Sequence, residues 1–213
     1  MSHMFEAKRR EYTQGGLRRT GLTACPFELF ARWFDQTEAA ELVDPTAMVL
    51  ATADAMGQPS QRIVLLKHLD KDGFVFYTNQ ASRKGRELRE NPKASLLFPW
   101  HALDRQVKVA GRVESVSQQM AADYFASRPR QSQLAAWSSA QSEVIDSRQV
   151  LLDTYERMEK EFDQVQIPMP ESWGGYRVIP ERIEFWQGGA YRLHDCFCYI
   201  RSDEGWSVER LAP

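Results

Sequence analysis

The order of apolar and polar residues predicts a mainly β chain with helices inserted between its strands. Two apolar runs, 62–67 and 74–78, flank Asp70-Lys71-Asp72-Gly73, a sequence typical of a tight turn in which glycine takes a positive φ. Both runs are apolar in their middles, so we expect two strands buried within a sheet. A short helix should follow, with Ser82 as its N-cap and an end before Asn91-Pro92.

The same pattern predicts three further helices and six further strands. The helices are expected over 26–42, over 118–128 after a Ser117 cap, and over roughly 146–163, and the strands over 47–55, 93–100, 105–116, 181–188, 191–201 and 206–211. The polar segment 127–144 and the proline- and glycine-rich segment 167–176 are interpreted as connections. Strands spaced in this way favour an antiparallel barrel with helical excursions over repeated βαβ units. We expect a mobile basic arm over residues 1–24 and a single domain over 25–213.

The composition is that of an ordinary globular protein. The chain has 213 residues, of which 43% are hydrophobic and 26% charged, so it can bury a substantial core. Its net charge of -2 provides no general attraction for nucleic acid, and any anion site must be local. No apolar run approaches the ~20 residues of a membrane span, and no secretory signal is recognisable. A cytoplasmic location is therefore expected.

Basic residues at the start of the short helix indicate an anion site. The first turn of a helix normally favours acidic side chains, whereas Arg83 and Lys84 occupy it here. A phosphate bound among these side chains and the free backbone N–H groups would remove the conflict. Arg62 and Lys67 on the preceding strand add positive charge. The alternative is that these side chains are only solvated.

The sequence lacks the motifs of several common nucleotide-binding and hydrolase sites. There is no GxGxxG, no GxxxxGK[ST] and no GxSxG, and only four histidines are present. His194, Cys196 and Cys198 alternate along a predicted strand, with Cys25 as a conceivable fourth ligand, but this spacing is poor zinc geometry and we predict no metal. Arg192 would share a strand face with His194; the alternatives are an anion-binding pair or a structural salt bridge beside a core histidine.

Taken together, the motifs resemble the pyridoxine/pyridoxamine 5'-phosphate oxidase family. The resemblance runs from about Arg9 to Pro213, and its most specific parts are RREYTQGGL, QRIVLLKH, VFYTNQASRKGREL, SLLFPWH, RQVKVAGRVE, YFASRPRQSQLAAW, WGGYRV, IEFWQGG, RLHD and ERLAP. It implies a split β-barrel (the FMN-binding split-barrel fold) and a homodimer that holds FMN at the subunit interface. It also implies oxidation of pyridoxamine 5'-phosphate and pyridoxine 5'-phosphate to pyridoxal 5'-phosphate, by hydride transfer to the flavin and reduction of O2 to H2O2.

The resemblance also assigns site residues. The cofactor would be bound by Arg62, Ile63, Val64, Leu65, Leu66, Lys67, Tyr77, Thr78, Arg83, Lys84, Gln106, Gln141, Ser142, Trp186 and, in place of a family arginine, Cys196. The substrate would be bound by Arg9, Tyr12, Lys67, Tyr124, Arg128, Ser132, Arg192, Leu193 and His194, with Arg192 and His194 as the catalytic pair. Tyr124 and Arg128 lie four residues apart, on one helix face, as a phosphate clamp requires.

One position departs from the family pattern. After RLHD the family has an arginine that contacts the flavin, and this chain has Cys196. Loss of ~1–2 kcal/mol of stabilisation of anionic reduced flavin would lower a two-electron potential by about 20–40 mV. This change leaves open an alternative to the oxidase, an FMN-binding split-barrel protein with impaired or no oxidase activity. A flavin reductase, or a relative with another substrate, is a separate alternative. The preferred substrate, and a second phosphate site near Arg18, Arg19 and Arg210, also stay open.

Overall fold

The computed structural model describes residues 11–12 and 15–213, and in this part of the chain it has nine strands with helices between them. The strands are β1 (Ala47–Ala53), β2 (Pro59–Leu65), β3 (His68–Asp70), β4 (Gly73–Asn79), β5 (Lys93–Trp100), β6 (Arg105–Ser115), β7 (Trp173–Gln187), β8 (Asp195–Ser202) and β9 (Gly205–Leu211). The α-helices are α1 (Pro26–Ala39), α2 (Arg83–Glu90), α3 (Gln118–Ser127), α4 (Arg130–Ser138) and α5 (Arg148–Glu161), with 3-10 turns at Arg19–Gly21, His101–Leu103 and Ala190–Arg192. The prediction of a mainly β chain with inserted helices is confirmed.

The strands form a sheet of order β2-β1-β5-β6-β7-β4-β3, to which β8 is added by pairing with β7 and β9 by pairing with β8. The β3–β4, β4–β7, β7–β8 and β8–β9 pairs are all antiparallel. The turn between β3 and β4 has the predicted form, because Gly73 has a φ of 148° and a Cβ at this position would lie 2.2 Å from the Val178 carbonyl oxygen. Only glycine fits this turn without displacing β7.

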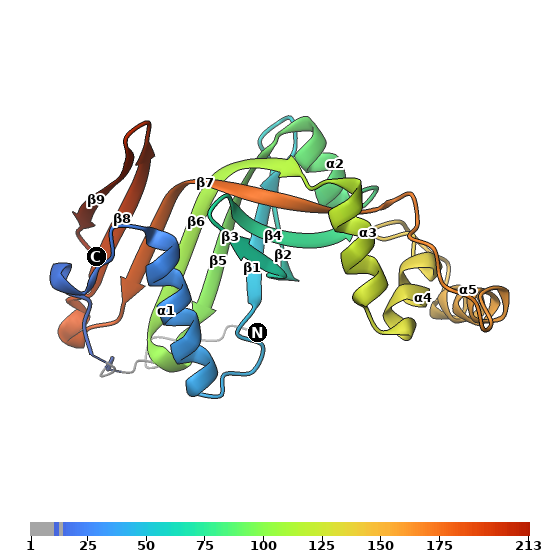
Figure 1. Cartoon of the computed structure of the whole chain (residues 1–213), viewed down its shortest axis with the longest axis horizontal. Helices are drawn as coiled ribbons and strands as arrows, with labels where there is room; N and C mark the ends of the chain where they lie inside the picture. Colours follow the sequence, from blue (N-terminus) through green and yellow to red (C-terminus); the bar gives the residue numbers. More distant parts are fainter. Residues whose placement is uncertain (1–10, 13–14) are drawn as a thin grey trace, which may run out of the picture. The chain divides into compact units, whose positions relative to one another are not determined.

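The chain divides into two compact units, and β1, β5, β6 and β7 contribute residues to both. The first unit comprises residues 1–49, 95–110 and 180–213. In this unit the predicted apolar stripe of α1 packs on β5, where Phe30 contacts Phe98 and Trp100 with ring centroids 4.9 and 5.4 Å apart (Figure 1). Trp33 of the same helix packs edge-on against Phe185 of β7.

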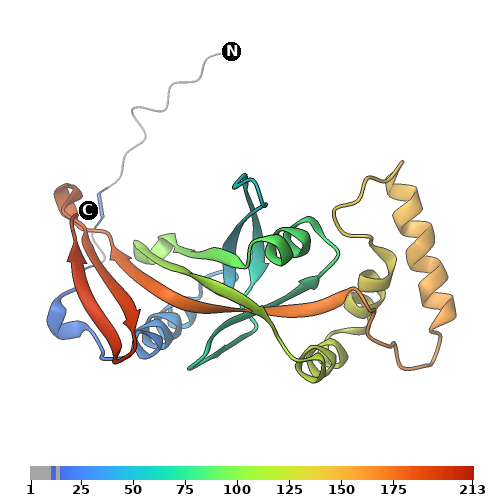
Figure 2. The same ribbon diagram turned by 90° about the horizontal axis from the view of Figure 1, so that it is seen from above.

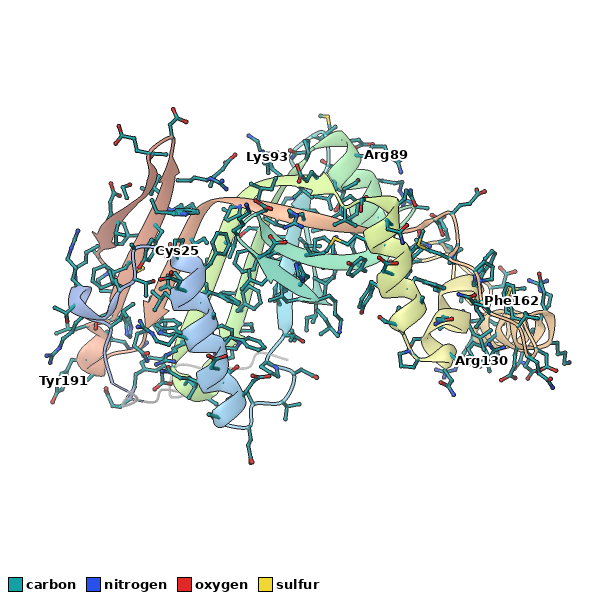
Figure 3. The ribbon with its side chains drawn as sticks, viewed as in Figure 1. Cys25, Arg89, Lys93, Arg130, Phe162 and Tyr191 are labelled. Carbon is teal, nitrogen blue, oxygen red and sulfur yellow. The ribbon has the colours of Figure 1, made fainter. Side chains whose placement is uncertain are left out.

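The second unit comprises residues 50–94 and 111–179. It has a small helical core in which Phe125, Leu134, Met158, Phe162 and Ile167 are buried together. In this core α4 lies beside α5 (Figure 2), and Arg130 at the start of α4 donates to the carbonyl oxygens of Phe162 and Val165 (Figure 3). The polar segment 127–144, interpreted as a connection, therefore contains a helix whose buried face is Leu134.

Three other local predictions need correction. Strand β2 is not buried, because Ile63 is 71% exposed and Leu65 40% exposed on this edge strand of the sheet. Strand β7 begins at Trp173, inside the segment interpreted as a connection. The strand expected over 191–201 begins only at Asp195, because Tyr191 and Arg192 adopt left-handed φ values of 56° and 66°. Arg192 and His194 therefore do not share a strand face.

Candidate functional site: a cationic cavity

The second unit contains a cavity of about 680 Å³ that is lined by five basic side chains. This volume is ample for a cofactor-sized ligand. The basic residues are Arg62, Lys67, Arg83, Lys84 and Arg128, and no carboxylate lines the cavity within the described residues. The remaining lining residues are Ser60, Gln61, Ile63, Val64, Leu65, Tyr77, Thr78, Asn79, Tyr124, Ala135, Ala136, Ser139, Gln141, Ser142 and Trp173.

Helix α2 begins as predicted, with Ser82 at the N-cap position and Asn91 at the C-cap. The Ser82 hydroxyl does not cap the helix; it donates instead to the Asn79 carbonyl oxygen at 2.6 Å. The first turn contains no acidic residue, so its positive end is balanced neither by a side-chain cap nor by a carboxylate in that turn. This is the arrangement from which the sequence predicted an anion site.

Lys84 points into a polar pocket of three oxygen atoms. Its Nζ lies 3.2 Å from Thr78 Oγ1, 3.3 Å from Ser82 Oγ and 3.1 Å from Gln141 Oε1. The side chain is 6% exposed, and burial together with the charge of Arg62 lowers its pKa to about 8. Within the described part of the chain no carboxylate contacts this buried ammonium directly, so its charge favours the binding of an anionic ligand.

Arg62 and Arg83 both contact Glu87, which faces them from α2. Arg83 Nε donates to Glu87 Oε1 at 2.8 Å, and Arg62 Nη2 lies 3.3 Å from Glu87 Oε2. Burial alone would raise the pKa of Glu87, but hydrogen bonds from Ser60, Thr52 and Arg83 and the charge of Arg62 outweigh it and lower that pKa to about 2. Glu87 is therefore ionised at neutral pH.

A second part of the cavity is aromatic. Tyr77 and Tyr124 stack with ring centroids 3.9 Å apart, and burial raises the pKa of both phenols, so both stay neutral donors at neutral pH. The Arg128 guanidinium lies 4.1 Å from the centre of the Trp173 ring. Arg128 Nη1 is buried without a hydrogen-bond partner in the described part of the chain. A buried guanidinium nitrogen of this kind is a donor ready for an anionic oxygen.

Other predicted site residues gather in the first unit, around the turn before β8. The ring of His194 lies 4.6 Å from that of Trp186 and 5.3 Å from that of Tyr12. The Gly189 N–H donates to His194 Nδ1 at 3.1 Å, so in the neutral imidazole the proton is on Nε2. Gly188 lets the Tyr12 ring approach, since a Cβ there would lie 2.8 Å from it. Figure 3 shows Tyr191 at this turn, and it is 84% exposed.

Cys196 is buried in β8, where it pairs with Trp186 of β7. Burial and the nearby Glu184 carboxylate raise the pKa of its thiol to about 12. The side chain at position 196 is therefore a neutral thiol at any physiological pH.

The structure brings most of the predicted cofactor residues into one cavity. These are Arg62, Ile63, Val64, Leu65, Lys67, Tyr77, Thr78, Arg83, Lys84, Gln141 and Ser142, together with the predicted substrate residues Tyr124 and Arg128. Leu66 is buried, and Ser132 is on α4 but does not line the cavity. Gln106, Trp186, Cys196, Tyr12, Arg192, Leu193 and His194 belong to the first unit, and Arg9 lies outside the described residues.

Sequence reasoning missed Trp173 and Glu87. The WGGY motif was available for Trp173, but its glycines and the prolines just before it, Pro168 and Pro170, favoured a loop. A signal for Glu87 was also present, because it follows Arg83 by four residues on the same helix face.

Comparison with known proteins identifies the family. A family model described as "Pyridoxamine 5'-phosphate oxidase" matches residues 34–161, and one described as "Pyridoxine 5'-phosphate oxidase C-terminal dimerisation region" matches residues 173–213. The chain belongs to the pyridoxamine 5'-phosphate oxidase family. The family resemblance expected from the sequence motifs is thus confirmed.

Individual members of the pyridoxamine 5'-phosphate oxidase family match nearly the whole chain. The pyridoxine/pyridoxamine 5'-phosphate oxidase of Cronobacter sakazakii is 56% identical over 205 residues, which cover 96% of this chain and 94% of that protein. The enzyme of the same name from Shewanella amazonensis is 55% identical, with 96% and 97% covered.

Solved structures support the same assignment. PhzG from Burkholderia lata, in complex with tetrahydrophenazine-1-carboxylic acid, is 29% identical with a TM-score of 0.87, covering 92% of this chain and 98% of that chain. An FMN-binding protein from Nostoc punctiforme related to pyridoxamine 5'-phosphate oxidase has a TM-score of 0.72 at 16% identity, covering 90% and 100%, and shares the fold. The split β-barrel predicted from the sequence is confirmed. Among the helices of the described residues, none is long and apolar enough to cross a membrane.

Proposed function

We propose that this chain is an FMN-dependent oxidase that converts pyridoxamine 5'-phosphate and pyridoxine 5'-phosphate to pyridoxal 5'-phosphate, a step of vitamin B6 metabolism, with O2 reduced to H2O2. Membership of the pyridoxamine 5'-phosphate oxidase family and relatives 55–56% identical over 96% of the chain support an oxidase of this class. The observation that carries the proposal is the cavity, which combines two anion-binding regions.

The residues of the cavity fit a phosphorylated flavin. The chemistry of the donor set is that of a phosphate site, since Arg62, Arg83 and Lys84 converge with the hydroxyl groups of Ser60 and Thr78. Each charge-assisted hydrogen bond to phosphate is worth roughly 1.5–3 kcal/mol. We propose that these cations hold the FMN phosphate, and that the backbone and side chains of 62–67 with Gln141 and Ser142 hold the rest of the cofactor.

The second anion-binding region fits the substrate phosphate. Arg128 has the unpartnered buried Nη1, Tyr124 has a neutral phenol beside it, and Lys67 lines the same cavity. We propose that Lys67, Tyr124 and Arg128 bind that phosphate, with Ser132 as a fourth contact. Two phosphates in one cavity explain why five basic side chains line it.

The chemistry itself falls to the cofactor, which when bound supplies the acceptor for the hydride that leaves the substrate. Arg192 and His194 are proposed to face the substrate's pyridine ring. His194 keeps a proton on Nε2 because Nδ1 accepts from Gly189, so it offers a hydrogen-bond donor to the substrate. Arg9, Tyr12 and Leu193 are proposed to complete the enclosure and exclude water, and Gln106, Trp186 and Cys196 to contact the flavin.

We propose that the protein acts as a homodimer with FMN at the subunit interface. The dimerisation-region match over 173–213 supports a dimer. Within the first unit the same region carries Trp186, Arg192, Leu193, His194 and Cys196, so these site residues outside the cavity are in the segment associated with pairing, whereas Tyr12 and Gln106 are not. A cytoplasmic location and a single domain over 25–213 stay predictions from the sequence.

One assay tests the proposal. Pyridoxamine 5'-phosphate is added to the purified FMN-loaded protein, and pyridoxal 5'-phosphate and peroxide are followed together. We expect equal amounts of both products. Bound FMN without either product would instead support an FMN-binding protein that lacks oxidase activity.

A further inference from the structure

Glu87 is a buried carboxylate that lies behind the basic residues of the cavity rather than in its wall. The residue is 4% exposed, and it accepts hydrogen bonds from Thr52 Oγ1, from Ser60 Oγ at 2.6 Å and from Arg83 Nε at 2.8 Å. Its second arginine partner is Arg62, at 3.3 Å. A carboxylate with this many donors is fixed in place from several directions.

The same contacts orient Arg62. Its Nη1 donates to Thr52 Oγ1 and its Nη2 to Ser60 Oγ, and these two hydroxyl groups in turn donate to Glu87 Oε2. Arg62 is thus held to Glu87 once directly and twice through a hydroxyl group. Its Nη1 also lies 3.4 Å from the Leu50 carbonyl oxygen, and among the residues that the structure describes its Nε–H has no hydrogen-bond partner, which leaves this donor for a ligand.

Arg83 is oriented in a complementary way. It gives only its Nε–H to Glu87, and no other hydrogen bond of its guanidinium is found among the described residues. The two terminal nitrogens remain free, and the side chain is 55% exposed. Anchoring by Nε leaves the planar edge of the guanidinium that binds a phosphate with two hydrogen bonds.

The charges of the cluster also match one ligand class. Arg62, Arg83 and Lys84 contribute three positive charges and Glu87 one negative charge, which leaves a net charge of +2. A phosphate monoester carries a charge close to -2 at neutral pH. Without Glu87 the three cations would repel one another with no acid to offset them.

We propose that Glu87 is a positioning residue that fixes Arg62 and Arg83 for the phosphate of the cofactor and balances the charge of the site to suit a phosphate dianion. The inference rests on the proposed function, because it takes the FMN phosphate to be the ligand of this cluster. It adds a residue that touches neither cofactor nor substrate, and it predicts that affinity for the phosphate depends on a buried acid.

The test compares Glu87→Gln with the unchanged protein, using FMN and riboflavin as probes of apoprotein. Glutamine keeps the shape of the side chain but loses the charge and turns one donor toward a guanidinium. We expect FMN to bind at least tenfold more weakly and riboflavin, which lacks the phosphate, to bind equally well. Glu90→Gln removes the same charge from an exposed position of the same helix and should change neither affinity.

The direction of the effect decides between two roles. If Glu87 only reduced the positive charge near the phosphate, its neutralisation would tighten FMN binding, and this result would overturn the proposal. Loss of affinity for FMN and riboflavin to the same extent would also overturn it, since that result indicates a purely structural role.

A double-mutant cycle gives a second readout. In an Arg83→Met background, Glu87→Gln should weaken FMN binding less than it does alone, because one of the two positioned groups is already absent. Additive effects would contradict positioning of Arg83. If Glu87→Gln does not fold, Thr52→Val removes one hydroxyl link with little change in shape and should weaken FMN selectively.

These outcomes separate the inference from the proposed function. Equal affinity of the unchanged protein for FMN and riboflavin would show that no phosphate is held here, and the cofactor site itself would be refuted. Strong preference for FMN that survives in Glu87→Gln would refute only the role of Glu87.

Discussion

We expect the buried ammonium of Lys84 to make the affinity for FMN depend on pH. Without a phosphate, burial and the charge of Arg62 lower the Lys84 pKa from 10.5 to about 8, and Glu87 offsets only part of this. A bound phosphate favours the protonated form, so binding above pH 8 takes up a proton. Affinity for FMN should therefore fall as the pH rises.

The size of the effect follows from this pKa. At pH 9 about one tenth of Lys84 is protonated in the apoprotein, so the dissociation constant of FMN should be roughly tenfold larger than at pH 7. At pH 8 the change is about twofold. The phosphate of FMN adds nothing in this range, because its second pKa is about 6.

The stability of the apoprotein should change in the opposite direction. Between about pH 8 and 10.5 the unfolded chain binds more protons at Lys84 than the folded chain does. The contribution of this group to the free energy of unfolding therefore rises with pH across that window. The penalty for burying the charged lysine is present in full below pH 8 and is lost above it.

Fluorescence titration of apoprotein with FMN and with riboflavin between pH 7 and 9.5 measures the effect. Lys84→Met keeps an unbranched side chain but removes the ammonium. This variant should bind FMN more weakly at pH 7 and show no further loss of affinity up to pH 9.5. The reasoning is refuted if FMN and riboflavin give parallel pH profiles, or if Lys84→Met retains the profile of the unchanged protein.

Three other substitutions test separate parts of the structure. Arg128→Met should raise the KM for pyridoxamine 5'-phosphate about tenfold or more and change FMN affinity little, because it removes only the charge-assisted hydrogen bond proposed for the substrate phosphate. Steady-state kinetics and FMN titration measure the two effects, and an unchanged KM would contradict the prediction. Cys196→Arg should tighten FMN binding and raise turnover, since it places a cation where the resemblance of the sequence motifs implies one. An unchanged affinity and rate would count against the importance of this position. Ser117→Ala should lower the free energy of unfolding by about 1 kcal/mol and the melting temperature by about 2–4 °C, because the Ser117 hydroxyl accepts a hydrogen bond from the Met120 N–H at the start of α3. Calorimetry on FMN-free protein would detect this loss. An unchanged melting temperature would show that the cap is dispensable.

The sequence predicted elements well where local chemistry decides their ends. Ser82 and Pro92 bracket α2, and the Ser117 cap begins α3, as expected. The sequence-based prediction was wrong where tertiary contacts determine the backbone conformation. The left-handed turn at Tyr191 and Arg192 breaks an otherwise continuous strand pattern, and α4 forms from a polar segment because Leu134 packs into a distant helical core.

In the candidate site, too, the residues that could be predicted are those marked by a local sequence pattern. The anion site was predicted from basic residues at a helix start, Arg83 and Lys84, with Arg62 and Lys67 added from a neighbouring strand, and all four line the cavity. The role of Glu87 was not predicted, because it depends on Thr52 of β1 and Ser60 of β2, which contact this helix residue only in the folded chain. Propensity and charge patterns identify residues that line the cavity, but the buried residues that contact them from behind are determined by tertiary packing.

The proposed cofactor residues of the cavity and the proposed substrate residues Arg192 and His194 are held in place by different kinds of local structure. This difference matches the roles that we propose for them. Arg62, Arg83 and Lys84 are on β2 and α2, and the first two contact the buried carboxylate of Glu87, which suits the long-term retention that we propose for the cofactor. Arg192 and His194 are on a turn with two successive left-handed residues, a conformation that stores of order 1–3 kcal/mol of strain per residue. That turn is held by the Gly189 bond to His194 and by the Leu193 N–H bond to the Ala190 carbonyl oxygen. If the proposed roles hold, rigid anchoring serves the cofactor, which stays bound, and a strained, exposed turn serves the substrate, which must enter and leave.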